Sequence, residues 1–277
     1  MKSWERNMVN DEELEMLLEE LFRACGYDFT SYAKASIKRR VNRLMVIDRH
    51  PSFAELFYRL KHSPEYLKHV VEQLTVNVTD MFRDPAVFKM MREDIIPQLA
   101  SYPVIRIWHA GCATGEEVYS MAILLAEANL LHKCLIYATD INPSVIINIQ
   151  KGIFPLSAMK QYSENYIQTG GKKDFSEYYT AKYNWAKFDD SLRIKMIAAT
   201  HNLVSDRSFN EFQVIFCRNV LIYFDKELQD KVLTLFDESL ENRGFLILGS
   251  KENLIFSPIA KKYKAVANKE KIWRKIS

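Results

Sequence analysis

The stretch RIWHAGCATGEEVYSMAI, residues 106–123, contains three local patterns that decide the fold. It begins as a strand, passes through a turn of small residues that includes Gly111 and Gly115, and continues as a helix. A strand that leads through such a turn into a helix is typical of a βαβ unit. Glycine lets the backbone approach a ligand closely because it has no Cβ. The stretch therefore predicts a ligand site where the strand ends.

Two carboxylates, Glu116 and Glu117, begin that helix and restrict the ligand. The N–H groups of a helix N-terminus usually receive an anion, but two acids there would repel a pyrophosphate. The glycine spacing G-x-x-x-G also differs from the dinucleotide pattern G-x-G-x-x-G. The pair suits a ligand that is cationic or rich in hydroxyls and amines. The alternative interpretation is that the two acids only complement the helix dipole.

A third acid supports a ligand of that kind. Asp140, in YATDIN, ends the next strand, where an acid accepts hydrogen bonds from ribose hydroxyls in Rossmann-like sites. An adenosine that carries a cationic amino-acid tail fits both observations, and S-adenosyl-L-methionine (SAM) is such a ligand. The cofactor that we predict is therefore SAM, with S-adenosyl-L-homocysteine (SAH) as its product.

Further along the chain, strand and helix patterns continue to alternate. The alternation predicts an α/β domain with a mostly parallel sheet, closed by an antiparallel hairpin around Asn268. We expect a helix over 225–240 whose end is marked by Gly244, followed by a strand over 244–249. The other expected elements are strands 134–140 and 212–217 and a helix over 143–152.

The segments on either side of this pattern look different. Residues 1–75 show helical periodicity and no convincing strand alternation, which predicts a small helical domain before the α/β domain of residues 76–277. Ser52 and Glu55 form a capping-box pattern at the start of one of these helices. At about 165–200 the pattern breaks around Gly170 and Gly171, which predicts an inserted antiparallel β-subdomain.

Composition limits the class of protein. The chain has 277 residues, 48% of them hydrophobic and 26% charged, and a formal net charge of +3, so an electrostatic partner must be recognised by a local patch. Its four cysteines show no C-x-x-C pairing, which argues against a zinc site or a disulfide framework. We expect no signal peptide, no membrane insertion, no metal and a cytoplasmic location.

Six stretches match one family in their order along the chain: SIKRRVNRL, TVNVTDMFRDPAVF, WHAGCATGEEVYSMAI, YATDIN, HNL and FCRNVLIYFD. They span nearly the whole chain, and the combination of TGEE with CRNVLIYF is specific. The chain resembles the CheR family of chemotaxis receptor methyltransferases, which are SAM-dependent protein-glutamate O-methyltransferases. The resemblance implies a helical domain, a Rossmann-like SAM-binding α/β domain and a small β-subdomain inserted in the latter.

The resemblance also implies roles for individual residues. Tyr223 would lie near the transferred methyl group, and Arg83 and Arg218 would guide the substrate carboxylate, which makes these three the candidate catalytic residues. The residues alone, without the resemblance, favour a core aromatic at a strand end for Tyr223 and a surface salt bridge for Arg218. The implied cofactor contacts are Asn77, Thr79, Arg83, Gly111, Glu117, Asp140, Asn202, Leu203, Asn219 and Val220.

The proposed chemistry needs few groups. Methyl transfer from a sulfonium to a carboxylate is an in-line displacement, and a glutamate is already ionised at neutral pH because its ordinary pKa is about 4.3. No general base is required, so positioning and desolvation would carry catalysis. This agrees with the lack of an evident His/Asp or Cys/His constellation in the sequence.

A basic helix in the first domain is the candidate for recognition of the receptor. It carries Lys34, Lys38, Arg39, Arg40 and Arg43, in which the pairs 34/38 and 39/43 are four residues apart. In the family, this helix faces the acidic methylation helices of the receptor. The alternatives are a solvated face or a nonspecific contact with nucleic acid. We expect receptor helices as partners, no specific nucleic-acid binding, and a monomer.

Some residues depart from the family pattern. Val118 stands where proline is usual after TGEE, and Ser250 and Lys251 in GSKENL replace the usual His and Ser. In the β-insertion, Lys172 and Lys173 stand where arginines would grip a receptor C-terminal pentapeptide, so we expect no tight tether. Two alternative functions stay open: a SAM- or SAH-binding regulator without turnover, and a methyltransferase for another acceptor.

Overall fold

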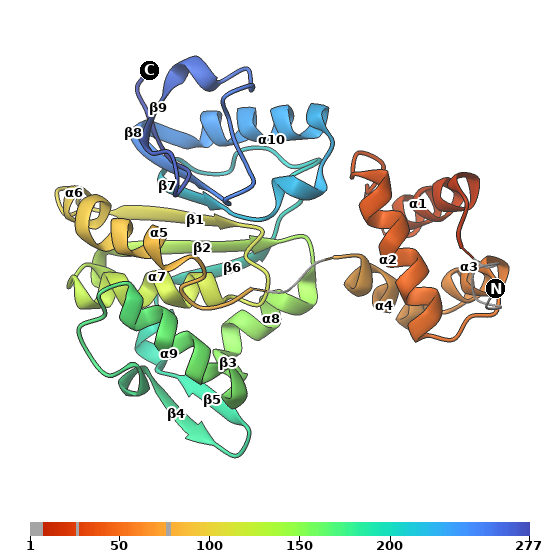
Figure 1. The fold of residues 1–277 in the computed structure, drawn as a ribbon, viewed down its shortest axis with the longest axis horizontal. Helices are drawn as coiled ribbons and strands as arrows, with labels where there is room; N and C mark the ends of the chain where they lie inside the picture. The colour runs from red at the N-terminus through yellow and green to blue at the C-terminus, as the bar shows by residue number, and fades with distance from the viewer. Residues whose placement is uncertain (1–7, 26–27, 76–78) are drawn as a thin grey trace. The chain divides into compact units, whose positions relative to one another are not determined.

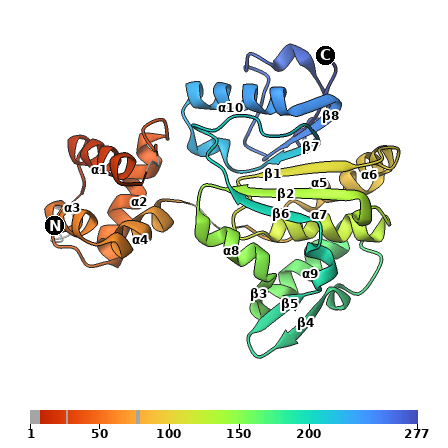
Figure 2. The ribbon, with the colours of Figure 1, turned by 180° about the vertical axis from the view of Figure 1, so that it is seen from behind.

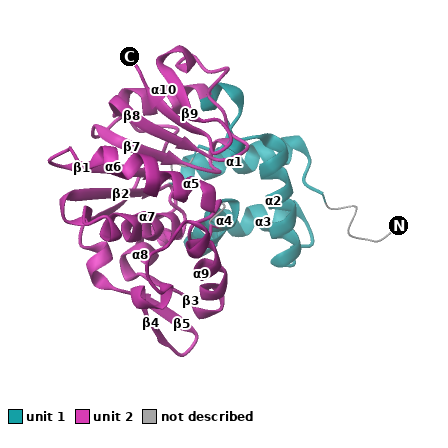
Figure 3. Cartoon of the chain, turned by 60° about the vertical axis from the view of Figure 1, so that its left-hand side comes forward, with its two compact units in different colours: residues 1–76, 222–229 teal, residues 77–221, 230–277 magenta. Residues whose placement is uncertain are grey.

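The computed structural model describes residues 8–25, 28–75 and 79–277, and the chain forms two compact units. Figure 3 shows the first unit, residues 1–76 and 222–229, in teal and the second, residues 77–221 and 230–277, in magenta. The first unit contains four helices before the connection to the second: α1 (Asp11–Cys25), α2 (Lys34–Ile47), α3 (Phe53–His62) and α4 (Pro64–Leu74).

The helices of the first unit pack around an apolar core. The stripe on α1 that faces this core consists of Leu14, Leu17, Leu18 and Leu21, all of them buried. The Oγ of Ser52 accepts a hydrogen bond from the N–H of Glu55 at 3.3 Å, which caps the start of α3 as the sequence predicts. These local signals explain why the helices begin where they do.

Residues 222–229 belong to the first unit although they follow a strand of the second. The N–H of Ala33 donates to the carbonyl of Tyr223 at 2.8 Å, and the N–H of Asp225 donates to the carbonyl of Ser31 at 3.0 Å. Tyr32 and Phe224 form an isolated antiparallel bridge, and their ring centroids are 4.9 Å apart. A short segment far along the chain therefore completes the helical unit.

A seven-stranded sheet in the order β6-β2-β1-β7-β8-β10-β9 forms the centre of the second unit (Figure 1). β6, β2, β1, β7 and β8 are mutually parallel, whereas β10 and β9 form an antiparallel hairpin at one edge. This arrangement confirms the predicted α/β fold with a C-terminal hairpin. The strands are β1 (Ile105–Ala110), β2 (Cys134–Asp140), β6 (Met196–Thr200), β7 (Phe212–Cys217), β8 (Leu240–Leu248), β9 (Tyr263–Ala267) and β10 (Ile272–Lys275).

Two consecutive residues of β1 point to opposite faces of the sheet and show that helices cover both faces. The Trp108 ring packs against Phe236 of α10, with centroids 5.3 Å apart. The neighbouring His109 points to the other face and pairs with Glu117 of α7. Figure 2 shows these helices from behind. The helices of this unit are α5 (Pro85–Met90), a π-helical turn (Met91–Ile95), α6 (Ile96–Leu99), α7 (Glu116–Glu127), α8 (Pro143–Lys151), α9 (Met159–Gln168) and, from residue 230 onward, α10 (Lys226–Ser239).

A small antiparallel sheet confirms the expected β-insertion. It has the order β3-β5-β4 and consists of β3 (Ile153–Pro155), β4 (Tyr179–Lys182) and β5 (Trp185–Phe188). Glu127 at the end of α7 ties the insertion to the core, because its carboxylate accepts hydrogen bonds from the hydroxyls of Tyr166 and Tyr178. The expected bounds of about 165–200 are wrong at both ends: β3, at 153–155, belongs to the small sheet, and residues 196–200 lie in the large sheet because they pair in parallel with β2.

The helix α10 ends at Ser239, within one residue of the expected range 225–240, but the strand after it begins earlier than expected. β8 starts at Leu240, so Gly244 lies inside the strand, and the expectation that Gly244 marks the end of the helix is wrong because Leu240 already pairs with Phe212 of β7. The Nζ of Lys275 donates to the carbonyls of Asp237 and Leu240, at 2.7 and 3.0 Å, and so satisfies acceptors at the helix end.

Candidate functional site

The site residues of the second unit lie at one edge of the sheet. β1, β2, β6 and β7 are parallel, so their carboxyl ends meet at the same edge. β2 and β6 lie on one side of β1, and β7 and β8 lie on the other. The strand order therefore reverses between β1 and β7, which creates a switch point there. Ligands of open α/β sheets bind at such a point. The predicted residues that follow these strand ends are Gly111, Asp140, Asn202, Leu203, Arg218, Asn219 and Val220.

Two glycines shape the turn after β1. Gly111 has a φ of +74°, and a Cβ there would lie 2.5 Å from the Cγ2 of Val220, in the turn after β7. Gly115 has a φ of +98°, and a Cβ there would lie 2.6 Å from the Cγ1 of Ile149. Because both positions combine a left-handed backbone with a close neighbour, only glycine fits them without strain. Gly111 thus brings the turns on both sides of the switch point together.

Asp140 fastens the glycine turn to the end of β2. Its carboxylate accepts hydrogen bonds from the N–H of Ala113 at 2.9 Å and from the N–H of Asn142 at 3.0 Å. Burial raises the pKa of Asp140, and these backbone donors oppose the rise. Each carboxylate oxygen has a second lone pair, so Asp140 can still accept a hydrogen bond from a ligand hydroxyl.

Glu117 is held between a histidine and an arginine. Its Oε1 lies 2.9 Å from Nδ1 of His109, and its Oε2 accepts a hydrogen bond from Nη1 of Arg218 at 3.1 Å. Burial favours the neutral acid, but the His109 hydrogen bond and the charge of Arg218 outweigh it and lower the pKa of Glu117. Glu117 therefore presents a negative charge at the switch point.

Arg218 is almost fully buried and has two acidic partners. Its side chain is 2% exposed, and it forms ion pairs with Glu117 at 3.1 Å and with Asp84 at 2.5 Å. It also donates to the carbonyl of Arg83 at 3.1 Å. The guanidinium thus joins the turn after β7 to the segment before α5. Its contacts favour a positioning role for Arg218, whereas the Arg83 side chain is half-buried.

Glu116, next to Glu117, has a different environment. Its carboxylate accepts hydrogen bonds from the hydroxyls of Thr114 and Tyr162, at 2.5 and 3.3 Å. Both donors are neutral, and burial raises the pKa of Glu116 to about 7. The two acids that the sequence presents as a pair therefore differ in charge state near neutral pH.

Glu252 holds the turn after β7 in place. Its carboxylate accepts hydrogen bonds from the N–H groups of Asn219, Val220 and Gly249, at 3.0, 2.8 and 2.5 Å. Asn219 has a φ of +61°, a strained value that the three bonds help to maintain. Sequence reasoning assigned no role to Glu252, and the Glu in GSKENL was the only available signal.

The remaining predicted cofactor contacts lie in flanking loops. The Oδ1 of Asn202 accepts a hydrogen bond from the N–H of Val204 at 2.9 Å. Leu203, beside it, is buried. Thr79 is half-buried, and Asn77 lies outside the described residues. The loop after β6 is therefore braced by its own side chain.

Tyr223 and the basic residues of α2 belong to the first unit. The guanidinium of Arg40 lies 4.5 Å from the centroid of the Tyr223 ring, and its Nη1 donates to the carbonyl of Leu74. Lys34 pairs with Glu15 at 2.7 Å, and Lys38 pairs with Asp11. Within the described residues, the exposed side chains of Arg39 and Arg43 have no ion-pair partner. The basic helix thus divides into internally paired and unpaired cations.

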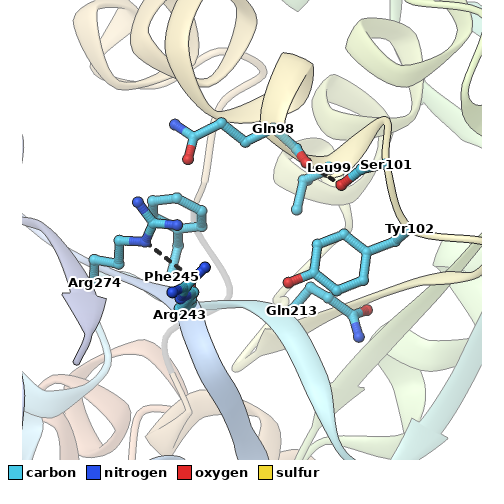
Figure 4. A pocket seen from close by; sticks show the side chains of 8 residues that line it. All are labelled: Gln98, Leu99, Ser101, Tyr102, Gln213, Arg243, Phe245 and Arg274. Carbon is cyan, nitrogen blue, oxygen red and sulfur yellow. Dashed lines mark hydrogen bonds between the residues drawn. The ribbon is translucent and has the colours of Figure 1, made fainter. Parts of the chain in front are cut away.

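A cavity lies at the opposite edge of the large sheet (Figure 4). It has a volume of about 270 Å³, and Gln213, at the start of β7, is one of its lining residues. The Nε of Arg274 donates to the carbonyl of Arg243, and the Arg274 guanidinium lies 5.2 Å from the Phe245 ring centroid. None of the predicted site residues lines this cavity.

The arrangement at the carboxyl edge can hold a cationic ligand rich in hydroxyls. It offers an ionised carboxylate, Glu117, a second carboxylate with spare lone pairs, Asp140, and a turn without side chains at Gly111. These groups fit the ammonium and the ribose of SAM. Across the described ranges, no three His, Cys, Asp or Glu side chains are grouped to bind a metal. In that part of the chain, no helix has both the length and the apolarity to cross a membrane.

Comparisons with known proteins find methyltransferases that are similar over most of the chain. The chain is 45% identical to the "Putative methyltransferase Cher3" of Pseudomonas putida KT2440 over 98% of both chains. It is 31% identical to chemotaxis protein methyltransferase 2 of Pseudomonas aeruginosa PAO1, over 88% of this chain and 87% of that protein. It is 29% identical to the chemotaxis protein methyltransferase of Listeria monocytogenes EGD-e, over 84% and 87%.

Two family models cover most of the chain. The all-alpha domain of CheR methyltransferases matches residues 12–75, and the SAM-binding domain of CheR methyltransferases matches residues 77–271. The second match contains every candidate residue at the carboxyl edge of the sheet, so SAM is the cofactor of this domain. With the site geometry and these matches in agreement, the chain belongs to the CheR methyltransferase family.

Proposed function

We propose that this protein methylates glutamate side chains on the cytoplasmic helices of chemoreceptors and so serves chemotactic adaptation. The products would be glutamyl methyl esters and SAH. The observation that carries the proposal is the ionised Glu117, held by His109 and Arg218 at the switch point of the sheet. A carboxylate there suits the ammonium of SAM, and relatives of similar length are chemotaxis protein methyltransferases.

The protein's own residues would act by positioning. SAM, when bound, supplies a methyl group on a sulfonium; a receptor carboxylate oxygen forms a bond to this carbon as the carbon–sulfur bond breaks. Glu117 and Asp140 would hold the ammonium and the ribose, and Gly111 leaves room for the ligand at the turn. No proton moves in this step, so no acid–base pair is needed. Asn77, Thr79, Asn202, Leu203, Asn219 and Val220 complete the proposed cofactor contacts.

Arg83 is the stronger candidate for guiding the receptor carboxylate. Arg218 already has the carboxylates of Glu117 and Asp84 as partners, and its side chain is 2% exposed. A charge-assisted hydrogen bond from Arg83 could hold the glutamate oxygens. Tyr223 keeps its proposed place near the methyl group on the strength of the family resemblance.

The test of this function uses methyl-labelled SAM and a chemoreceptor cytoplasmic fragment. We expect label on the receptor that mild base releases as methanol, because methyl esters are base-labile. A fragment whose methylatable glutamates are changed to alanine serves as the control and should stay unlabelled. SAM binding without transfer would favour a regulatory relative, and transfer to another acceptor would favour a different methyltransferase; either result would overturn the proposed substrate.

We further propose that Arg39 and Arg43 dock the receptor. Lys34 and Lys38 on the same helix are partly neutralised by acids of α1, whereas the two arginines are exposed and unpaired within the described residues. They lie four residues apart and therefore on one face. An acidic receptor helix would meet these two charges first.

Two double variants of equal charge change test the docking surface. R39Q/R43Q should raise the KM for the receptor fragment about tenfold, because unpaired cations contribute most to association. K34Q/K38Q removes the same charge from the same helix and should have a much smaller effect. The charge reversal R39E/R43E should abolish receptor methylation, and the affinity for SAM should stay unchanged in all three. Equal effects of the two neutral pairs would contradict this assignment.

A further inference from the structure

We propose that His109 is a positioning residue that sets the place and the charge of Glu117, and so controls how tightly the site holds the amino-acid tail of SAM. The inference rests on the proposed role of Glu117 as the partner of the cofactor ammonium. The sequence suggested no role for His109, because methyl transfer to a carboxylate needs no general base.

His109 is held in one orientation by its surroundings. It lies on β1 and is completely buried, and its ring stacks on Phe216 with centroids 4.6 Å apart and an angle of 10° between the planes. Its Nδ1 lies 2.9 Å from Oε1 of Glu117. The stack fixes the ring plane, and the hydrogen bond then fixes one oxygen of the carboxylate. Arg218 holds the other oxygen at 3.1 Å.

The other ring nitrogen identifies the protonation state. The Nε2 of His109 is buried and has no hydrogen-bond partner among the residues that the structure describes. An N–H at this position would be a buried donor without an acceptor, which is costly. We therefore assign the ring proton to Nδ1, which donates it to Glu117, as part of this inference.

A neutral His109 leaves the linked group of Glu117, Arg218 and Asp84 with a net negative charge. Glu117 and Asp84 contribute two negative charges, and Arg218 contributes one positive charge. The surplus charge of −1 is complementary to the single positive charge of an α-ammonium. A cation at position 109 would cancel it, and a side chain without a donor would release one oxygen of Glu117. Histidine thus positions the acid without neutralising it.

The test measures binding of two ligands by calorimetry. SAH carries the ammonium, whereas 5′-methylthioadenosine has the same nucleoside without the amino-acid tail. His109→Leu should weaken SAH binding about tenfold to a hundredfold, which is the effect of losing a charge-assisted hydrogen bond, and should leave methylthioadenosine binding within about twofold. His109→Asn, whose amide N–H can take the place of Nδ1, should recover most of the lost affinity.

Two controls separate positioning from general stability. Ile107→Ala creates a cavity on the same strand, and should lower stability without changing the ratio of the two affinities. The double variant H109L/E117Q should bind SAH no more weakly than E117Q alone, because His109 acts through Glu117. Equal losses for both ligands in H109L, or additive losses in the double variant, would overturn the inference. Since only binding is measured, the result does not depend on whether a receptor is methylated.

Discussion

Glu116 and Glu117 are neighbours in sequence, but they lie in two regions of the protein interior that treat a carboxylate in opposite ways. Around Glu116 the donors are the neutral hydroxyls of Thr114 and Tyr162, and burial raises its pKa to about 7. Around Glu117 the imidazole of His109 and the guanidinium of Arg218 outweigh burial and lower the pKa. The charge of a buried acid is thus decided by its partners.

This difference matters for function because only one of the two acids is a reliable anion. Glu117 can attract a cation over the whole physiological pH range, whereas Glu116 exchanges its proton near neutrality. Glu116 therefore acts mainly as a link between the glycine turn and α9, through Thr114 and Tyr162. Substitutions that change one environment and leave the other intact test whether the partners cause this difference.

The largest effect is expected for Arg218→Met. Removal of the guanidinium leaves the buried Glu117 carboxylate without its cationic partner, which typically costs about 3–5 kcal/mol. The pKa of Glu117 should rise, so that the two glutamates become alike. Urea unfolding at pH 7 measures the loss. Arg218→Lys, which keeps the charge but not the forked geometry, should lose less; the same loss in both variants would mean that charge is not the cause.

A smaller effect of opposite sign is expected for Glu116→Gln. The folded-state pKa of Glu116, about 7, lies above the ordinary value of 4.5, so the protonated acid is favoured in the folded protein. Its stabilising contribution is present below about pH 4.5 and is lost as the pH rises through about 7. The neutral amide avoids this loss and should stabilise the protein by about 1–3 kcal/mol at pH 8.

The pH dependence is the decisive part of that measurement. The gain from Glu116→Gln should shrink toward zero when unfolding is measured at pH 5 instead of pH 8. The matched change Glu117→Gln should destabilise the protein at both pH values, because it removes the anion that His109 and Arg218 hold. A constant gain at the two pH values for Glu116→Gln would show that the acid is already ionised in the folded state.

The smallest effect is expected for Tyr162→Phe. The change removes a hydroxyl that donates to Glu116 at 3.3 Å, a long hydrogen bond worth about 0.5–1 kcal/mol. It should also raise the pKa of Glu116 further, since one donor to the ionised form is gone. Thermal unfolding of Tyr162→Phe in the wild-type and E116Q backgrounds measures the coupling between the two residues. The loss of stability should be smaller when glutamine occupies position 116. A larger loss in the E116Q background would place the role of Tyr162 elsewhere, in packing.

Local patterns in the sequence were sufficient for most of the architecture. Apolar periodicity located α1 to α4 and the parallel strands β1, β2, β7 and β8, but not β6, and glycines with small residues located the turn after β1. Parallel strands bring their carboxyl ends together, so the proposed site residues Gly111, Asp140 and Asn219 share one edge of the sheet, although Asn219 was proposed only from the family resemblance. The early start of β8 was not predictable, because Leu240 pairs with Phe212 of β7, which is distant in sequence.

Local sequence patterns were thus enough to give the class of fold, the edge of the sheet where the candidate site lies, and the residue types placed there. Which of these residues are charged, and which are held in place, depends on contacts that form only in the folded protein. Arg218 reaches Glu117 across 101 positions of sequence, and Glu252 reaches Val220 across 32. Burial and hydrogen-bond partners set a pKa, and both arise when distant segments pack together, so no local pattern can encode them.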